Sequence, residues 1–297
     1  MKLAAIDIGS NAARLLICEV RENGNDSPEF QKLNLVRVPL RLGFDVFEFR
    51  QISYAREEML VDTIKAFKLL MDVHQVDFMT ACATSAMRDA SNGPEIIERI
   101  KNETGVNIHI ISGDTEAEYI YGTRLMERNI PAKSFLYIDV GGGSTEITLF
   151  ENGELVYKSS HNIGTIRILK NQVSDDQWNI MKADIRKLVK NKTGKMVAIG
   201  SGGNINKVFS LSKRKEDKPL YLDTLKDYYK ELSSVTVAER IRLYKLKEDR
   251  ADVIVPALLI YINVLKWAEI EEIYVPKIGL ADGLIRNLYS RITGKKP

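Results

Sequence analysis

The chain has 297 residues, with 43 lysines and arginines against 40 aspartates and glutamates, for a formal net charge of +3. Its 44% hydrophobic and 28% charged residues indicate an ordinary globular protein, which excludes a disordered chain and a strongly basic nucleic-acid-binding protein. The length predicts one large or two medium domains. The longest apolar stretch, 253–265, contains Pro256 and is too short to span a bilayer, so we expect a cytoplasmic protein with no membrane partner.

Short apolar runs alternate with amphipathic stretches in the first half of the chain, which predicts an open α/β domain. Ser53 is placed to cap a long helix, and Gly105 to end a later one. The expected strands are 2–7, 14–20, 33–39, 78–83 and 106–111, and the expected helices follow residue 53, cover 94–104, and run from about 113 through 128.

The second half repeats this alternation and then becomes mostly helical. Asn152-Gly153 is the best hairpin turn in the sequence, and Ser174 is placed to cap a helix. The expected strands are 135–139, 146–150, 154–159, 196–199 and 272–275, and the expected helices are 174–191, 204–212, 223–232, 236–247, 252–267 and 281–292.

One pattern occurs twice: AIDIGS at 5–10 and YIDVGG at 137–142 each place an aspartate and small residues after an apolar strand. Each copy is followed by another strand-like run. The duplication predicts two related domains that face one another. We expect them at 1–124 and 125–297, with a C-terminal helix at about 281–297 that packs back on the first.

The turn at Gly141-Gly142-Gly143-Ser144-Thr145 carries the sharpest chemical signal. Consecutive glycines let backbone N–H groups converge on an anion, and the two hydroxyls add donors. A strand rather than a helix follows, which excludes the GxxxxGK[ST] and dinucleotide-binding loops. A tight hairpin without a ligand is the alternative, but the second copy at 7–11 favours a phosphate site between two domains.

Two carboxylates, Asp139 and Glu146, flank this turn. Singly, they would be a turn-capping aspartate and a solvent-facing strand residue. Beside a phosphate, a carboxylate is useful mainly through a cation, because Mg²⁺ can bridge it to phosphate oxygens. Taken together around the turn, they favour a metal site.

Three further features stay open on spacing alone. Glu116 is either a helix-start acid or a general base that orients water, and Thr115 and Glu118 next to it have the spacing of a capping box. Arg88, after a predicted strand end, is either a phosphate clamp or a surface cation. Gly200 to Gly203 is either a plain turn or a contact for a phosphate or a nucleoside.

Seven segments of the chain, in the order in which they occur, resemble those of the exopolyphosphatase and guanosine pentaphosphate phosphohydrolase family (Ppx/GppA). The resemblance covers the chain nearly end to end. It rests on DIGSNAARL (7–15), ATSAMRDASN (83–92), ISGDTEAEYIYG (111–122), DVGGGSTEI (139–147), GSGGN (200–204), RADVI (250–254) and IGLADGL (278–284).

The resemblance implies two ribonuclease-H-like domains of the actin-like ATPase superfamily around an interdomain cleft. It implies that Glu116 is the base acting on water, that Asp139 and Glu146 hold the metal, and that Asp7 faces it through water. The metal would be Mg²⁺, with Mn²⁺ as an alternative, and the reaction would hydrolyse a terminal phosphoanhydride with Arg88 assisting. The expected phosphate contacts are Gly9, Ser10, Asn11, Arg14, Gly141, Gly142, Gly143, Ser144 and Thr145.

The chain departs from the family at Ala12, where many members have serine, and at Ala281-Asp282, where Arg-Glu is common. From its length we expect only the catalytic core of long members, which makes short-chain or nucleotide substrates more plausible and leaves the choice between them open. The first hypothesis for the function is an exopolyphosphatase acting on polyphosphate. The alternatives are a guanosine pentaphosphate phosphohydrolase with nucleotide contacts at Gly200, Gly202 and Gly203, or a regulator that binds guanosine penta- or tetraphosphate with little turnover. A superfamily kinase fits the SGDTEA segment less well, and a homodimer follows from the resemblance alone.

Overall fold

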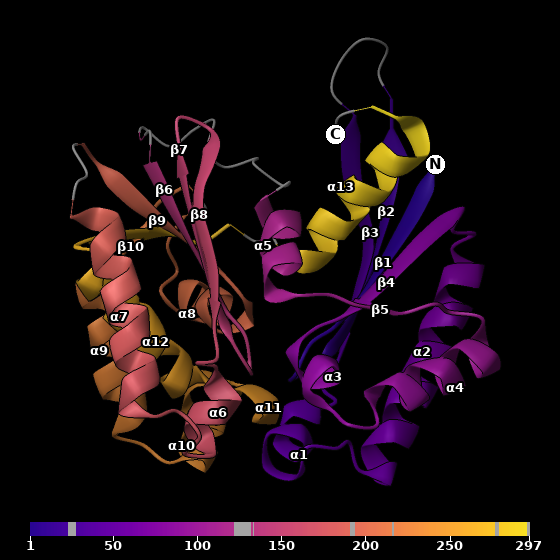
Figure 1. Ribbon diagram of the computed structural model, residues 1–297, viewed down its shortest axis with the longest axis horizontal. Coiled ribbons are helices and arrows are strands. Elements are labelled where there is room, and N and C mark those ends of the chain that lie inside the picture. The colour runs from indigo at the N-terminus through magenta and orange to yellow at the C-terminus, as the bar shows by residue number, and fades with distance from the viewer. Residues whose placement is uncertain are drawn as a thin grey trace. The chain divides into compact units, whose positions relative to one another are not determined.

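The computed structural model (Figure 1) divides the chain into two compact units. The first comprises 1–123 and 278–297, and the second comprises 124–277. The predicted domain boundary at 124/125, and the part of the predicted helix after residue 121, lie outside the described residues. The residues that the structure describes are 1–22, 28–121, 132, 134–190, 194–215, 217–276 and 279–295.

The first unit contains a five-stranded sheet in the order β3-β2-β1-β4-β5. β1, β2 and β3 are antiparallel neighbours, whereas β4 and β5 run parallel to β1. Its elements are β1 (Lys2–Ile8), β2 (Ala13–Arg21), β3 (Glu29–Val38), α1 (Leu42–Phe49), α2 (Tyr54–Val73), β4 (Phe78–Ala83), α3 (Ser85–Asp89), α4 (Gly93–Thr104), β5 (His109–Ile110), α5 (Gly113–Tyr121) and α13 (Leu280–Thr293).

The core of the first unit forms around β1, which is buried along almost all of its length. A central strand covered on both faces reads as one continuous apolar run, as residues 3–6 do. On one face, Leu3 and Leu16 pack with Leu284 and Tyr289 of α13, the last helix of the chain. Residues from both ends of this unit's sequence therefore share one core.

The second unit contains a six-stranded sheet in the order β10-β11-β9-β6-β7-β8. Asn152 and Gly153 both have positive φ in the β7–β8 turn, as expected for an Asn-Gly hairpin. Its elements are β6 (Ser134–Val140), β7 (Thr145–Glu151), β8 (Glu154–His161), α6 (Thr165–Leu169), α7 (Asp175–Val189), β9 (Met196–Ser201), α8 (Gly203–Leu211), β10 (Leu220–Tyr221), α9 (Leu222–Ser233), α10 (Val237–Tyr244), α11 (Glu248–Ala251), α12 (Ile254–Trp267) and β11 (Glu272–Tyr274).

The second core is built on α12, an apolar helix that packs against α6, α7, α8 and α9. Leu258, Tyr261 and Leu265 of α12 are fully buried with Leu136 and Ile138 of β6. Ser174 caps the start of α7, as the sequence predicts. The structure adds Gln177, whose side chain completes a capping box with Ser174.

The two sheets have the same strand order and directions. β8-β7-β6-β9-β11 of the second unit corresponds to β3-β2-β1-β4-β5 of the first, with three antiparallel strands followed by two parallel ones. The repeated AIDIGS and YIDVGG segments occupy β1 and β6, the central strands of the two sheets. The duplicated pattern therefore marks a duplicated sheet.

Several predicted elements have different limits in the structure. β3 begins at Glu29 rather than residue 33. The strand expected at 106–111 is only two residues long in the structure, where His109 and Ile110 pair with Cys82 and Ala83 of β4. The short helices α1, α3 and α6 have no predicted counterpart. Helix α5 begins at Gly113, and Ser112 rather than Thr115 caps it, since Ser112 Oγ accepts from the Thr115 N–H at 3.1 Å.

Candidate active site

The glycine turn of the second unit joins β6 to β7 and is held by α6. The carbonyls of Gly141 and Gly142 accept from the N–H groups of Thr165 and Ile166 at 3.0 and 2.9 Å, and the Gly143 carbonyl accepts from Arg167 Nε at 2.8 Å. All three carbonyl oxygens therefore point toward α6.

The opposite side of the turn presents its N–H groups. The described residues contain no cis peptide bond, and across a trans peptide the C=O of one residue and the N–H of the next point in opposite directions. The N–H groups of Gly142, Gly143 and Ser144 consequently point away from α6. Three successive donors on one side of a glycine turn form an anion-binding arrangement.

Close packing explains why Gly164, at the start of α6, is glycine. A Cβ at Gly164 would lie 2.4 Å from the Gly142 carbonyl oxygen and 2.5 Å from the Gly143 carbonyl carbon. Real contacts are never this short, so a larger residue would displace the turn from α6. The glycine turn and Gly164 form one unit of packing.

The hydroxyls of the turn are bonded within the protein. Ser144 Oγ donates to Glu146 Oε1 at 2.7 Å, and Thr145 Oγ1 donates to the Ile163 carbonyl at 2.6 Å. Both side chains are buried. The expected phosphate contacts through Ser144 and Thr145 stay predictions, and the donors directed outward are the backbone N–H groups.

Asp139 and Glu146 lie directly opposite one another on β6 and β7. Opposed residues of an antiparallel pair project from the same face of the sheet, so both carboxylates share one face. Glu146 is 3% exposed, and its Oε1 accepts from Ser144 and also from Ser160 Oγ of β8 at 2.8 Å. Asp139 Oδ1 lies close to the backbone of Gly202, 3.2 Å from the position a Cβ there would take.

Tyr261 of α12 contacts the turn after β9, and its hydroxyl lies 3.6 Å from the position that a Cβ would take at Gly202. Its hydroxyl donates to the Ser201 carbonyl, and its side chain is 1% exposed. Burial raises the pKa of the Tyr261 phenol far above its usual value, and the negative charges of Asp139 and Glu146 raise that pKa further. The phenol therefore stays protonated and donates.

The donor set around Asp139 fits a hard divalent cation. Mg²⁺ is usually held by one or two carboxylates, with water and substrate phosphate completing its six oxygen ligands. Among the residues that the structure describes, no three His, Cys, Asp or Glu side chains gather as a metal cluster. The Asp139–Glu146 pair thus offers two protein carboxylates, which suits Mg²⁺ better than a metal that needs an all-protein cage.

The corresponding turn of the first unit joins β1 to β2. The Ser10 and Asn11 carbonyls accept from the N–H groups of Gly43 and Arg41, at the start of α1, at 2.9 and 3.0 Å. By the same peptide geometry, the N–H groups of Asn11 and Ala12 point away from α1. In both turns the first glycine donates its N–H to the carbonyl three residues on, Gly9 to Ala12 and Gly141 to Ser144. The repeat therefore extends to the hydrogen bonds of the turns.

Two side chains predicted around the first turn bond to one another. Arg14 Nη1 lies 2.7 Å from Asp7 Oδ2, and the two residues are opposed on β1 and β2. Ser10 Oγ lies 2.8 Å from Ser85 Oγ, and both residues are buried. The predicted roles of Asp7 toward a metal and of Ser10 and Arg14 toward phosphate stay predictions.

Arg88 and Glu116 come from segments that follow the parallel strands β4 and β5. Arg88, on α3, donates from Nη1 to the Ile111 carbonyl at 2.9 Å, which ties α3 to the segment leading into α5. Glu116 lies in the first turn of α5 and is partly exposed. Burial raises the pKa of the Cys82 thiol, and the charges of Asp7 and Glu116 raise it further. Asp7 lies opposite Cys82 in the β1–β4 register.

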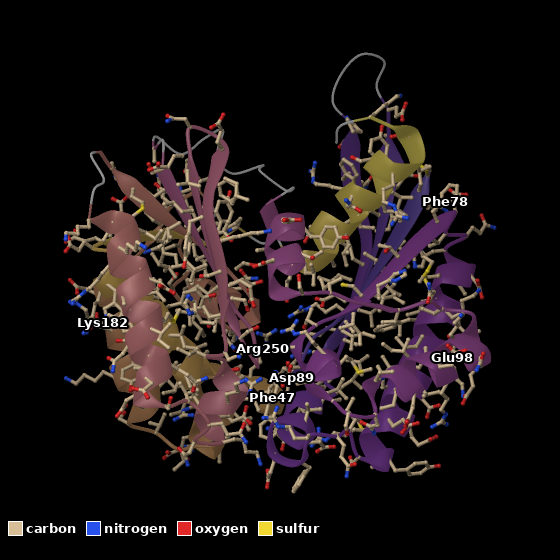
Figure 2. The ribbon with its side chains drawn as sticks, viewed as in Figure 1. Phe47, Phe78, Asp89, Glu98, Lys182 and Arg250 are labelled. Carbon is tan, nitrogen blue, oxygen red and sulfur yellow. The ribbon has the colours of Figure 1, made fainter. Side chains whose placement is uncertain are left out.

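The turn at Gly200–Gly203 leads from β9 into α8. Gly202 has a φ of 112°, which glycine adopts readily and other residues rarely do. Gly203 is the first residue of α8, and a Cβ there would lie 2.2 Å from Arg250 Nη1. Arg250, labelled in Figure 2, therefore places its guanidinium against the N-terminal end of α8.

Sequence reasoning missed the residues that support the turn. These residues contact partners that are not their neighbours in the sequence, and they are Ser160, Gly164, Arg167 and Tyr261. Only two of them carry a local signal: Arg167 is a cation, and Tyr261 is a single phenol in an apolar stretch. Their partners depend on which strands and helices become neighbours.

A model of the Ppx/GppA phosphatase family matches residues 21–291. The chain belongs to the Ppx/GppA phosphatase family. Membership confirms the predicted family and the predicted class of enzyme, a hydrolase of the Ppx/GppA type.

Curated Ppx/GppA relatives are distant. Exopolyphosphatase 1 of Mycobacterium tuberculosis is 24% identical over 318 residues, covering 99% of this chain and 90% of the relative. The guanosine-5'-triphosphate,3'-diphosphate pyrophosphatase of Aeromonas salmonicida is 26% identical, covering 96% of this chain and 59% of the relative. The bifunctional 3-dehydroquinate synthase/phosphatase of Fusobacterium nucleatum is 28% identical, covering 89% of this chain but only 43% of the relative.

Solved Ppx/GppA structures match over almost the whole chain. An exopolyphosphatase from Cytophaga hutchinsonii superposes with a TM-score of 0.81 at 25% identity, covering 100% of this chain and 99% of that one. The Aquifex aeolicus family member gives 0.77 at 23% identity, covering 99% of both chains. These matches confirm the predicted two-domain, actin-like α/β fold. Within the described residues, none of the helices is both long and apolar enough to cross a membrane.

Proposed function

We propose that this Ppx/GppA protein is a Mg²⁺-dependent exopolyphosphatase of the cytoplasm that releases orthophosphate from the end of inorganic polyphosphate. The observation that carries the proposal is the β6–β7 turn. Its N–H groups at Gly142, Gly143 and Ser144 are turned away from α6, and the turn joins the two strands that carry the opposed carboxylates Asp139 and Glu146. Anion donors adjoining cation ligands suit a metal-bound phosphate.

The roles of the residues follow from their chemistry. The N–H groups of the turn would hold phosphoryl oxygens with fixed dipoles, which need no rearrangement as charge develops. Asp139 and Glu146 would hold Mg²⁺, or Mn²⁺ in its place, which supplies positive charge to the phosphate oxygens. Glu116 would orient a water molecule and accept its proton, and Arg88 would offset phosphate charge.

The position of Arg250 also favours an anionic ligand. The guanidinium of Arg250 lies against Gly203, the first residue of α8, and the N-terminal end of a helix carries partial positive charge. A guanidinium and the N–H groups of a helix N-terminus both suit phosphate oxygens. Arg250 would therefore add a second phosphate contact in the second unit.

We place polyphosphate before guanosine pentaphosphate because a solved exopolyphosphatase superposes on the whole of this chain with a TM-score of 0.81. Relatives named exopolyphosphatase 1 also align over 99% of this chain. Guanosine pentaphosphate is the second candidate, and the turn at Gly200, Gly202 and Gly203 is the place where a nucleoside contact would be sought.

Phosphate release distinguishes these functions. Short polyphosphate, long polyphosphate, guanosine pentaphosphate and ATP would be compared in Mg²⁺ and after its removal by EDTA. We expect the highest kcat/KM on polyphosphate and loss of release in EDTA. Release from guanosine pentaphosphate alone would favour the second candidate. Tight binding of guanosine penta- or tetraphosphate without release from any substrate would favour a regulator.

Two matched pairs of variants test the assigned residues. Glu116→Gln should lower kcat by about 10²- to 10⁴-fold with substrate binding kept, whereas Glu118→Gln on the same helix should change little. Glu146→Gln should raise the Mg²⁺ concentration needed for half-maximal rate, whereas Glu154→Gln on the exposed start of β8 should not. Full activity of Glu116→Gln would remove Glu116 from the reaction.

A further inference from the structure

Helix α13 and helix α5 of the first unit touch backbone to backbone. A Cβ added to Gly283 would lie 1.9 Å from the carbonyl oxygen of Tyr119 and 2.4 Å from its carbonyl carbon. Figure 1 shows α13 running alongside α5. No side chain at position 283 fits unless one of the two helices moves.

Glycine at position 283 lowers the intrinsic stability of helix α13. Gly283 lies in the interior of α13, four residues after Gly279, which precedes the helix. Glycine in a helix interior is less favourable than alanine, because its backbone loses more freedom on folding. The close approach of Tyr119 supplies the packing reason for a glycine here.

Side chains on both sides of Gly283 tie the two helices to the sheet. Leu280 and Leu284 of α13 pack with Ile111, which precedes α5, and with Cys82 of β4. The side chain of Tyr119 packs against the same cluster. The contact between α13 and α5 is therefore continuous with the core beneath them.

The rest of α13 is anchored away from α5. Asp282 accepts from the Gly279 N–H at 2.9 Å and pairs with Lys32 of β3. Tyr289 donates to Glu22 Oε1 at 2.7 Å, just beyond β2. Because α13 is fixed to the β2–β3 side of the unit, it acts as a support against which α5 is placed.

Glu116 lies one turn of α5 before Tyr119, so its position depends on how closely α5 approaches α13. We propose that Gly283 is a positioning residue for Glu116: its missing side chain sets the depth at which α5 packs, and so the placement of the Glu116 carboxylate. This inference rests on the proposed role of Glu116 as the base. A displacement of about 1 Å in a reacting group can cost about 100-fold in rate.

The experiment compares Gly283→Ala with Leu288→Ala, which loosens the same helix at its other end. Steady-state hydrolysis of polyphosphate and backbone amide exchange of residues 113–119 would be measured below the unfolding temperature of each variant. In Gly283→Ala, kcat should fall about 10- to 100-fold with KM within about twofold, and exchange in α5 should rise. In Leu288→Ala, both readouts should match the wild type, although stability falls.

The outcomes separate this inference from the proposed function. Wild-type protein without phosphate release on any substrate would contradict the function, whereas unchanged exchange of 113–119 in Gly283→Ala would contradict the positioning. Equal losses of kcat in Gly283→Ala and Leu288→Ala would also overturn the positioning. If Gly283→Ala does not fold, Tyr119→Ala loosens the contact from the α5 side. Raised exchange in α5 and lowered kcat at constant KM support the inference, and wild-type values for both oppose it.

Discussion

Asp7 and Arg14 form an ion pair of 2.7 Å across the first hairpin, with the Asp7 side chain 3% exposed and that of Arg14 33% exposed. Asp7 precedes the β1–β2 turn and Arg14 follows it, and Asp7 has the place in β1 that Asp139 has in β6. The repeated aspartate therefore faces different residues on the neighbouring strand in the two units. Asp7 faces Arg14, whereas Asp139 faces Glu146. This difference explains why the second unit is the better candidate for holding a cation.

Replacing Arg14 should destabilise the protein, because the Asp7 carboxylate is buried. Arg14→Met should lower the free energy of unfolding by about 3 kcal/mol, because the buried Asp7 carboxylate would lose its guanidinium partner. Urea unfolding measures the loss, and the double variant Asp7→Asn with Arg14→Met should recover part of it. A loss no larger than that of an exposed pair such as Arg21–Glu19 would contradict the prediction.

Gly164→Ala should disrupt the glycine turn of the second unit, which we propose binds phosphate. The added methyl group would overlap the Gly142 carbonyl at 2.4 Å, so α6 and the turn must separate. We expect a rise in KM for polyphosphate together with lower stability. Gly279→Ala, where no atom lies within 4 Å of the added methyl group and φ is −148°, serves as the control for substituting glycine. An unchanged KM in Gly164→Ala would show that the turn does not bind substrate.

Acid should destabilise the protein through His161. Burial lowers the pKa of His161 below its usual value, and the nearby Asp184 charge opposes this only in part. The unfolded chain therefore binds a proton more readily than the folded one between the lowered pKa and the ordinary value of about 6.5. Stability is present above that window and is lost as the pH falls through it. The free energy of unfolding should drop more from about pH 7 to about pH 5 in wild type than in His161→Gln. Equal slopes would contradict this.

Tyr261→Phe should cost about 1–2 kcal/mol of stability, because the Ser201 carbonyl would lose its buried donor. Tyr244→Phe is the matched control: its hydroxyl donates to Glu231 at 2.6 Å near the surface, where water can replace it. We expect a clearly smaller loss there. Similar losses in the two variants, measured by urea unfolding, would mean that the Tyr261 hydroxyl is not the buried donor described above.

The sequence predicts the parts of this protein that depend on local signals. The strands β1 and β6, the Asn152-Gly153 hairpin and the end of α4 at Gly105 follow from apolar runs and turn residues, and their limits agree with the structure within one or two residues. The internal repeat predicts the duplicated sheets. Each strand, turn or helix end is predicted from a pattern of about ten residues or fewer, and the repeat from the comparison of two such patterns.

The parts that escape prediction depend on residues distant in the chain. The helix α6 has only five residues, and it exists because its N–H groups meet the carbonyls of the glycine turn. Ser160 reaches Glu146 only because β8 pairs with β7 in one register. The hydroxyls of Ser144 and Thr145 look like phosphate donors in the sequence, yet the fold brings Glu146 and the Ile163 carbonyl within their reach.

The course of the chain has a consequence for synthesis on the ribosome. Residues 124–277 form the second unit as one uninterrupted stretch, whereas the first unit needs both 1–123 and 278–297. As domains generally fold when their residues emerge, the second unit can fold while the first still lacks α13. Until that last helix is translated, Leu3 and Leu16 of the central sheet lack their apolar cover. A nascent chain would therefore carry a folded second unit beside a first unit that still lacks α13.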